Sequence, residues 1–178
     1  EMCFALMGIS INDTLLDTIV NDMIQKTVEI NNCACSAIIS NPLSDYLKLA
    51  DTYQKLKEGF HIRVIRKQQW QCIFLDELQY DRIMLHISED TEVHQFIRCK
   101  LGPLVEYDRA HDTQLLETLE ALIQNHNSRK FAAESFFLHR NTMVHRINKI
   151  EEVLHCSLDD TEIMEQLEFA IKMKMYAH

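Results

Sequence analysis

The chain has 178 residues, of which 47% are hydrophobic and 25% are charged. These fractions are those of an ordinary globular protein and argue against extended disorder, and the length allows one good hydrophobic core or two small ones. There is no apolar run of about eighteen residues and no signal-peptide pattern, which predicts a cytoplasmic protein that does not cross a membrane. The first residue is Glu1, so we expect a piece of a longer polypeptide with an upstream part.

The net charge of −9 argues at face value against binding to nucleic acid, because a phosphate-binding surface must be positive somewhere. The charges are unevenly distributed, however. Residues 127–150 carry one acidic side chain, Glu134, and five basic ones, so the net charge of this stretch is +4. The basic residues are Arg129, Lys130, Arg140, Arg146 and Lys149. A basic island on an acidic body is typical of a protein that contacts DNA through one small surface.

The six cysteines and nine histidines do not form a recognisable site. There is no CxxC pair, so reduced thiols in a cytosolic protein are the simplest interpretation. Cys33 and Cys35 would share a face if they lie on a strand, but no further zinc ligands accompany them. The histidines lack the spacing of metal ligands or of a general base. The sequence therefore predicts no catalytic residues, no metal site and no cofactor.

The N-terminal part of the chain predicts alternating strands and helices. Residues 2–10 form a short apolar run that suits a buried strand. Residues 12–30 repeat apolar side chains at helical spacing and predict an amphipathic helix. Residues 33–40 are small and apolar and lie between Asn and Asn-Pro punctuation, which is typical of a central strand.

The next stretch continues this mixed pattern up to one marked break. A second helix is expected to follow Pro42 and end near Gly59, and the alternation between residues 61 and 74 suits one or two short strands, as in an edge hairpin. Residues 76–100 predict two more helices. Gly102-Pro103 then interrupts a chain that has only three glycines and two prolines. We therefore predict an α+β domain over residues 1–100 and an all-α domain over residues 101–178.

Residues 127–154 predict a helix-turn-helix. The first helix would run from about Ser128 to Phe136, with Asn127 or Ser128 as its cap. Its inward residues would be Phe131, Ala132 and Phe136. In the second helix the apolar residues follow at intervals of four, three and four, on one face: Met143, Ile147, Ile150 and Leu154.

Two further helices would complete this domain. Asp112 can cap a leucine-rich helix over residues 115–123, which would pack behind the helix-turn-helix. Asp159 and Glu162 resemble a capping box at the start of a last helix, which carries inward-facing apolar residues up to Ile171.

The outward face of the second helix and its surroundings supply the candidate binding residues. These are the side-chain types that bind base edges or phosphates when a helix end enters the major groove. The predicted DNA-binding residues are Arg140, Asn141, Thr142, His145, Arg146 and Lys149 on this helix, His139 just before it, and Arg129 and Lys130 on the first helix.

Each candidate has an alternative role. Arg140 could bind a guanine, clamp a phosphate or be a surface charge, and Asn141 could bind adenine or cap the helix. Arg146 borders the buried stripe, so a salt bridge to Glu134 or a neighbouring acid is an equal alternative.

The remaining candidates are also open to two interpretations. Arg129 and Lys130 suit phosphate contacts but could be merely solvated. His139 and His145 would add positive charge if protonated on DNA, in which case binding should tighten as the pH falls.

Several motifs in this chain occur in the same order in a known family: Leu101-Gly102-Pro103-Leu104-Val105-Glu106-Tyr107-Asp108, then Leu115-Leu116-Glu117-Thr118-Leu119, Ala132-Ala133-Glu134, and His139-Arg140-Asn141-Thr142 with Arg146-Ile147. Together, over residues 101–174, they resemble the C-terminal DNA-binding domain of the PucR/CdaR family of bacterial transcriptional regulators, with a helix-turn-helix of the Fis type. Residues 1–100 are more weakly similar to the degenerate GGDEF-like domain that precedes it in such regulators, a ferredoxin-like mixed sheet.

The resemblance implies that the GGDEF-like domain is not catalytic. The residues agree, because the signature itself is absent and no paired acidic residues are placed to hold two Mg²⁺ ions. The helix-turn-helix departs from the family pattern in three places. Phe137 stands in the turn where a glycine is usual, Val144 stands where Fis-like helices tend to have a basic side chain, and His145 stands where family members often have an aromatic one.

These observations predict a transcriptional regulator that binds double-stranded DNA and controls a catabolic operon. A homodimer is expected, because one recognition helix reads too few base pairs for useful specificity. A small-molecule effector would act through an upstream domain. The alternatives are a cyclase-related, nucleotide-binding enzyme, or a module in which the N-terminal domain senses a metabolite or mediates dimerisation.

Overall fold

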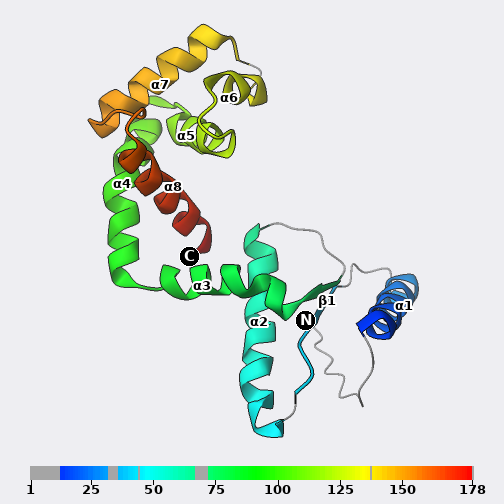
Figure 1. Ribbon diagram of the computed structural model, residues 1–178. Helices are drawn as coiled ribbons and strands as arrows, with labels where there is room; N and C mark the ends of the chain where they lie inside the picture. Colours follow the sequence, from blue (N-terminus) through cyan, green and yellow to red (C-terminus); the bar gives the residue numbers. More distant parts are fainter. Residues whose placement is uncertain (1–12, 32–35, 44, 67–71, 137, 178) are drawn as a thin grey trace. The chain divides into compact units, whose positions relative to one another are not determined.

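The computed structural model describes residues 13–31, 36–43, 45–66, 72–136 and 138–177. The chain forms two compact units, Glu1–Ile83 and Met84–His178 (Figure 1). The predicted domain boundary at residues 100 and 101 falls inside a continuous helix, 17 residues after the start of the second unit at Met84. The expected strand at residues 2–10 lies outside the described residues.

The regular secondary structure in the described part of the N-terminal unit is helical apart from two three-residue strands. In chain order its elements are α1 (Asp13–Asn31), β1 (Ala37–Ile39), the 3₁₀ helix η1 (Tyr46–Lys48), α2 (Leu49–Arg66), β2 (Cys72–Phe74), the 3₁₀ helix η2 (Leu75–Leu78) and the beginning of α3 (Gln79–Ser88). The predicted helix at residues 12–30 is confirmed, and among its described side chains Val20 and Ile24 are buried.

The two strands of this unit pair in parallel, with Ala37 opposite Cys72 and Ile39 opposite Phe74. A parallel pair needs a crossover connection, which α2 provides. The hairpin expected within residues 61–74 is wrong, because residues 61–66 belong to α2 and β2 is the one strand in the described part of that segment. Among the described residues the sheet has only these two strands. The mixed sheet of a GGDEF-like domain is not seen there, and that assignment stays a prediction.

Helix α2 does not end near Gly59, as the sequence suggested, but continues to Arg66. Gly59 instead allows close packing, because a Cβ at this position would lie 2.6 Å from Ile38 Cδ1 and 3.0 Å from Leu78 Cδ1. Ile62, whose alternation with Val64 predicted a strand, is 1% exposed on this helix. Burial of one helical face has overridden a strand-like pattern.

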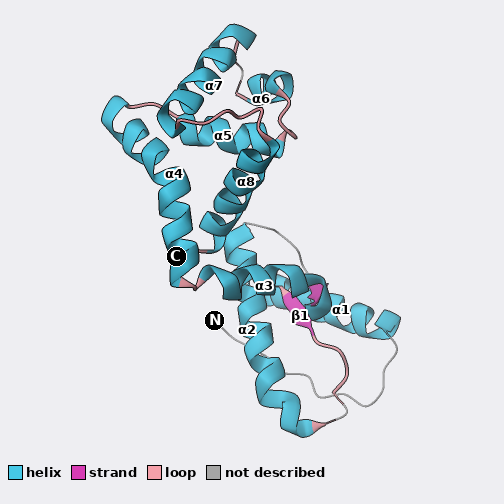
Figure 2. Cartoon of the chain, turned by 60° about the vertical axis from the view of Figure 1, so that its left-hand side comes forward, coloured by secondary structure: helices cyan, strands magenta, loops and turns pink. Residues whose placement is uncertain are grey.

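The C-terminal unit is all-α over the residues described, as predicted. After the end of α3 it contains α4 (Thr91–His111), α5 (Leu115–Gln124), α6 (Arg129–Ser135), α7 (Arg140–Leu154) and α8 (Thr161–Tyr176). Helices α4 and α8 lie side by side, and α5, α6 and α7 gather at one end of this pair (Figures 1 and 2). Among the described helices, none is long and apolar enough to cross a bilayer.

Gly102 and Pro103 lie within α4 and do not break it. A proline inside a helix costs about 3 kcal/mol, because it removes a hydrogen bond and crowds the preceding turn. Leu101 is 1% exposed and Leu104 is fully buried, and burial of each side chain contributes about 1.5–3 kcal/mol. Gly102 also lacks the Cβ that would crowd the proline ring in a helical backbone. The core therefore holds the helix together across the proline.

Two predicted helix caps differ from the observed ones. Asp112 does not cap α5 but ends α4, in the left-handed conformation with φ of 51°. Helix α8 is capped one residue later than expected, by Asp160, whose carboxylate accepts hydrogen bonds from the backbone N–H groups of Glu162 and Ile163. The inward positions of α8 are largely as predicted, with Leu167, Ala170 and Ile171 among the buried residues.

Candidate nucleic-acid interface

The first helix of the predicted helix-turn-helix is α6, which Ser128 caps by accepting a hydrogen bond from the N–H of Phe131 at 3.4 Å. Its buried face consists of Ala132 and Ala133, which are 0% and 4% exposed. The inward placement of Phe131 is wrong, because its side chain is 55% exposed. Two successive small residues let this short helix approach α5 and α7 closely, and Phe131 points away from that contact.

Helix α7 has the orientation that its apolar spacing predicted. Met143, Ile147 and Ile150 are all 0% exposed, and Leu154 is half-buried against the same core. The opposite side of the helix faces solvent, since a 3.6-residue period turns the intervening positions outward. Four of the predicted DNA-binding residues are exposed together on its N-terminal half: Arg140, Asn141, Thr142 and His145.

His139 caps α7, and Asn141 does not. The Nδ1 atom of His139 accepts a hydrogen bond from the N–H of Asn141 at 3.3 Å. This bond supplies an acceptor for one of the N–H groups at the start of α7.

The cap gives a testable stability effect. Replacement of His139 with alanine is expected to lower the free energy of unfolding by about 1 kcal/mol, the usual value of an N-cap side chain. Replacement with asparagine, which caps well, should leave stability unchanged or raise it. Urea unfolding followed by circular dichroism measures both, and equal stability of the alanine and asparagine variants would contradict a capping role.

Arg146 is directed into the unit. Its Nη1 donates a hydrogen bond to Thr118 Oγ1 at 3.1 Å, and its guanidinium carbon lies 5.7 Å from the centre of the Phe136 ring. Thr118 is fully buried on α5. Among the described residues the hydrogen-bond partner of Arg146 is thus Thr118, and the alternative pairing with Glu134 is not seen. The Arg146 side chain fixes α7 to α5.

Lys149 is also engaged within the unit. Its ammonium donates to both carboxylate oxygens of Glu152 at 2.9 Å and lies 5.1 Å from the centre of the Tyr107 ring. The hydrogen bond to Glu152 raises the pKa of Lys149, and the lysine stays positively charged. Because Tyr107 belongs to α4, this contact connects α7 to α4.

The two basic residues of α6 differ in their contacts. Arg129 forms an ion pair with Asp159 at 2.9 Å, which connects the start of α6 to the segment before α8. Lys130 is exposed and lies 5.8 Å from the centre of the Phe131 ring. Of the five basic side chains in this island, Lys130 and Arg140 are the two without an ion pair or hydrogen bond to another described residue. They are the most available for phosphates.

Asp108 is a structural residue of this site that sequence analysis did not identify. From α4 its carboxylate accepts hydrogen bonds from the N–H of Leu115 at 2.8 Å, the N–H of Leu116 at 2.9 Å and the hydroxyl of Thr113. It therefore caps α5, whose own N-cap residue, Gln114, makes no side-chain cap bond. The available signal was the position of an aspartate at the end of the first family motif, a few residues before a leucine-rich helix.

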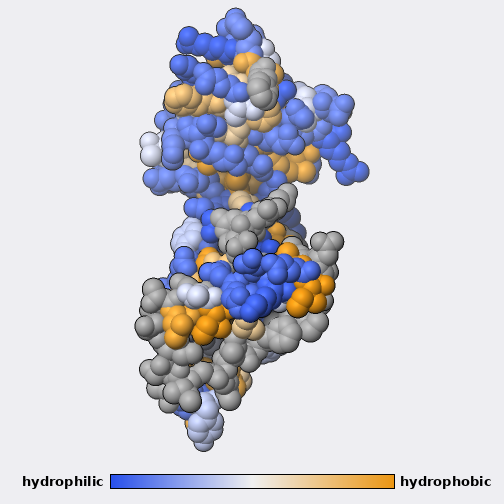
Figure 3. Space-filling view, turned by 90° about the vertical axis from the view of Figure 1, so that its right-hand side faces the viewer, coloured by the Kyte–Doolittle hydropathy of each residue, from blue (hydrophilic) through white to orange (hydrophobic). Residues whose placement is uncertain are grey.

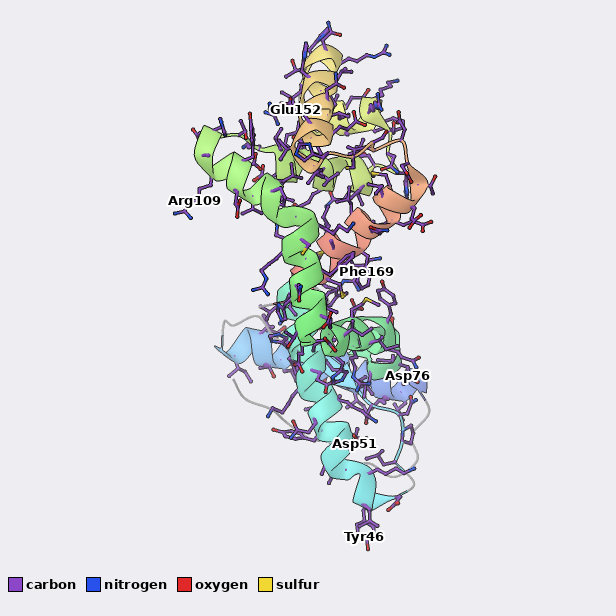
Figure 4. All side chains as sticks on the ribbon, turned by 90° about the vertical axis from the view of Figure 1, so that its left-hand side faces the viewer. Tyr46, Asp51, Asp76, Arg109, Glu152 and Phe169 are labelled. Atoms are coloured by element: carbon purple, nitrogen blue, oxygen red, sulfur yellow. The ribbon has the colours of Figure 1, made fainter. Side chains whose placement is uncertain are left out.

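The hydrogen bonds outweigh burial in setting the charge state of Asp108. Burial by itself raises the pKa of this carboxyl, but the bonds from Leu116, Thr113 and Leu115 and the attraction of Arg146 lower it further, so the net shift is downward. Helices α4, α5 and α7 are thus connected by the side chains of Asp108, Thr118 and Arg146. In Figure 4 the exposed end of α4 near Arg109 extends beside α7.

No group of three or more His, Cys, Asp or Glu side chains that could hold a metal occurs among the described residues. In the direction shown in Figure 3, the surface of the C-terminal unit is predominantly hydrophilic. In this unit the polar N-terminal half of α7 is exposed to solvent. Contacts with α5 and α4 hold the helix in place from its inner side.

Comparison with known proteins agrees with this geometry. Residues 115–173 match the model of the PucR C-terminal helix-turn-helix domain, which spans α5 to most of α8. The chain is 30% identical over 130 residues to the proline-responsive transcriptional activator PutR of Bacillus subtilis (strain 168), covering 72% of this chain and 32% of that protein. No solved structure matches the chain.

A second relative in the same organism is the purine catabolism regulatory protein, 31% identical over 91 residues, which cover 51% of this chain and 17% of that protein. The uncharacterized protein YsfB is 27% identical over 114 residues, covering 64% of this chain and 28% of YsfB. The chain thus spans about a third or less of the length of these relatives. Residues 115–173, which form α5 to most of α8, are therefore similar to the PucR C-terminal helix-turn-helix domain.

Proposed function

We propose that this chain is the DNA-binding part of a sequence-specific transcriptional regulator, in which α7 enters the major groove of duplex DNA as in Fis-type helix-turn-helix proteins. The observation that carries the proposal is the exposed polar face at the N-terminal end of α7, within a unit whose family model is a helix-turn-helix domain. The N-terminal residues of a recognition helix are those that contact base edges.

Within this proposal the predicted residues take different roles. Arg140 binds a guanine edge with two hydrogen bonds, and Asn141, Thr142 and His145 bind neighbouring bases. Lys130, with Arg129 beside it, binds the phosphate backbone next to the groove.

The remaining predicted residues hold α7 in position. Arg146 and Lys149 fix α7 through Thr118, Glu152 and Tyr107, and their charges add to the positive potential near DNA. His139 caps the recognition helix.

The wider role is proposed from the relatives. One is described as a transcriptional activator responsive to proline and another as a regulator of purine catabolism, which supports control of a catabolic operon by a cytoplasmic, non-enzymatic protein. A homodimer on a two-fold symmetric site is proposed because a single recognition helix contacts few base pairs. An effector would act through another part of the longer regulator.

The phosphate contact is testable by its dependence on salt. Replacement of Lys130 with alanine should weaken binding to every duplex sequence about equally and reduce the slope of log K against log salt by about 1, since one phosphate contact is lost. Fluorescence anisotropy titrations of labelled duplexes at several salt concentrations measure this slope. The matched control is Lys172 to alanine on α8, and an unchanged slope for the Lys130 variant would contradict the proposed contact.

A further inference from the structure

A cavity of about 450 Å³ lies in the N-terminal unit, beyond the ends of the two strands. Its walls come from the segments that directly follow β1 and β2 and from α2 and α3. The lining residues are Ser40, Asn41, Pro42, Leu43, Thr52, Lys55, Leu75, Asp76, Gln79 and Arg82. Its volume is within the range of about 300–1,000 Å³ that is typical of small-molecule sites.

The position of the cavity follows from the topology. Because Ile39 and Phe74 pair at the last position of each parallel strand, the residues after both strands leave the sheet at the same edge. In parallel α/β arrangements ligands bind beyond the carboxyl ends of the strands, where the chain segments diverge. Asp76 is close to the end of β2, and Asp51 is on the neighbouring helix α2 (Figure 4).

One part of the lining offers hydrogen-bond acceptors. The amide nitrogen of Asn41 donates to Asp76 Oδ2 at 2.5 Å, which orients both side chains. This bond leaves Asp76 Oδ1 and Asn41 Oδ1 as acceptors, and a carboxylate next to an amide oxygen favours a positively charged N–H donor. An ammonium group matches this pair.

Another part of the lining offers cationic donors. Lys55 pairs with Asp51 on its own helix, and Arg82 Nε donates to Glu58 at 2.7 Å. An ammonium has three donor hydrogens and a guanidinium has five, so each cation has donors beyond these bonds. A carboxylate on a ligand would accept from them.

The charge balance selects between ligand classes. The two cations of the lining, with Asp76 and the carboxylates of Asp51 and Glu58, sum to −1. A ligand with a net negative charge would therefore be repelled, whereas a ligand that carries one positive and one negative group could satisfy both parts of the lining at no net charge. Pro42, Leu43 and Leu75 supply an apolar wall for an aliphatic portion.

We infer that this cavity binds a small zwitterion, an α-amino acid with an aliphatic side chain. The ammonium group binds to Asp76 and Asn41, the carboxylate binds to Lys55 and Arg82, and the aliphatic group contacts Pro42, Leu43 and Leu75. This inference concerns the N-terminal unit and goes beyond the proposed DNA binding. The two proposals are tested by different experiments, and failure of one leaves the other unaffected.

The test is a two-dimensional ¹H–¹⁵N spectrum of the full 178-residue chain, titrated with L-valine, L-leucine, L-isoleucine and L-proline, one at a time. At least one of these amino acids should shift the backbone amide signals of residues around the cavity, such as Asn41, Leu43 and Asp76. L-valine methyl ester and N-acetyl-L-valine, or the same derivatives of whichever amino acid binds, each lack one charge. Each derivative should bind about tenfold more weakly or worse, because one charge-assisted contact is lost.

Two variants and a matched control localise the binding. Asp76→Asn and Lys55→Gln should each raise the dissociation constant by about tenfold or more. Lys26→Gln, which breaks an exposed pair with Asp22 on α1, should leave it unchanged. The spectrum of each variant also reports whether it is folded, and the two cavity variants are independent of one another. No shifts with any of the four amino acids, equal binding of the ester or N-acetyl derivative, or shifts confined to other residues would overturn the inference.

Discussion

Replacement of Arg140 with alanine is expected to weaken binding to a specific DNA site by about 1–3 kcal/mol, which is a factor of roughly 5 to 150 in the dissociation constant. Arg140 is exposed at the first position of α7 and makes no ion pair with another described residue. A guanidinium there can bind the O6 and N7 atoms of a guanine with two hydrogen bonds. The loss should therefore be large on the specific site and small on unrelated duplexes.

The comparison that checks this is a competition titration of wild type and the Arg140 variant on a specific and a scrambled duplex. Lys172 to alanine is the matched control, since it removes one positive charge from α8. If the Arg140 variant loses the same affinity for both duplexes, the residue is a phosphate clamp and not a base reader. An unchanged affinity for both would show that the binding face lies elsewhere.

Replacement of Asp108 with alanine is expected to destabilise the chain by about 2 kcal/mol, which is more than the ~1 kcal/mol of a single N-cap. The variant would leave the N–H groups of Leu115 and Leu116 and the hydroxyl of Thr113 without their acceptor. It would also remove the negative charge that attracts Arg146. Asparagine at this position keeps one acceptor oxygen and should give an intermediate loss in urea unfolding.

The contribution of Asp108 should also depend on pH in a defined direction. Because the folded state lowers the pKa of this carboxyl below its ordinary value of 3.8, its stabilising effect is present above that value and is lost as the pH falls through the lower, folded value. The difference in unfolding free energy between wild type and the Asp108 to asparagine variant should therefore shrink in acid. A difference that stayed constant from neutral to strongly acid pH would contradict the assigned hydrogen bonds.

The sequence was most informative where one helix face is buried in a single core. The spacing of Met143, Ile147 and Ile150 determined both the existence of α7 and the side that faces solvent, because burial requires these residues to point one way. The exposed residues at its N-terminal end follow from that orientation. A contact such as Arg146 to Thr118 could not be predicted, since its partners are 28 residues apart and depend on how α5 crosses α7.

Local signals failed where tertiary packing overrides them. Gly102-Pro103 is a break by propensity, yet Leu101 and Leu104 bury the helix on both sides of it. Gly59 is a helix terminator by propensity, but it lies where α2 packs closely against Ile38 and Leu78. In both cases the free-energy cost of a residue with poor helix propensity is smaller than the free energy gained from the apolar side chains that the continued helix buries.

The most direct test of the proposed DNA binding is the selection of bound duplexes from a random double-stranded pool by the 178-residue chain. The proposal predicts enrichment of a short motif that occurs as two inverted half-sites about one helical turn apart, or a multiple of it, as two recognition helices of a dimer require. The Arg140 to alanine variant should lose discrimination at one position of each half-site. Recovery of no enriched sequence, with binding of all duplexes equally weak, would contradict the role of α7 as a recognition helix.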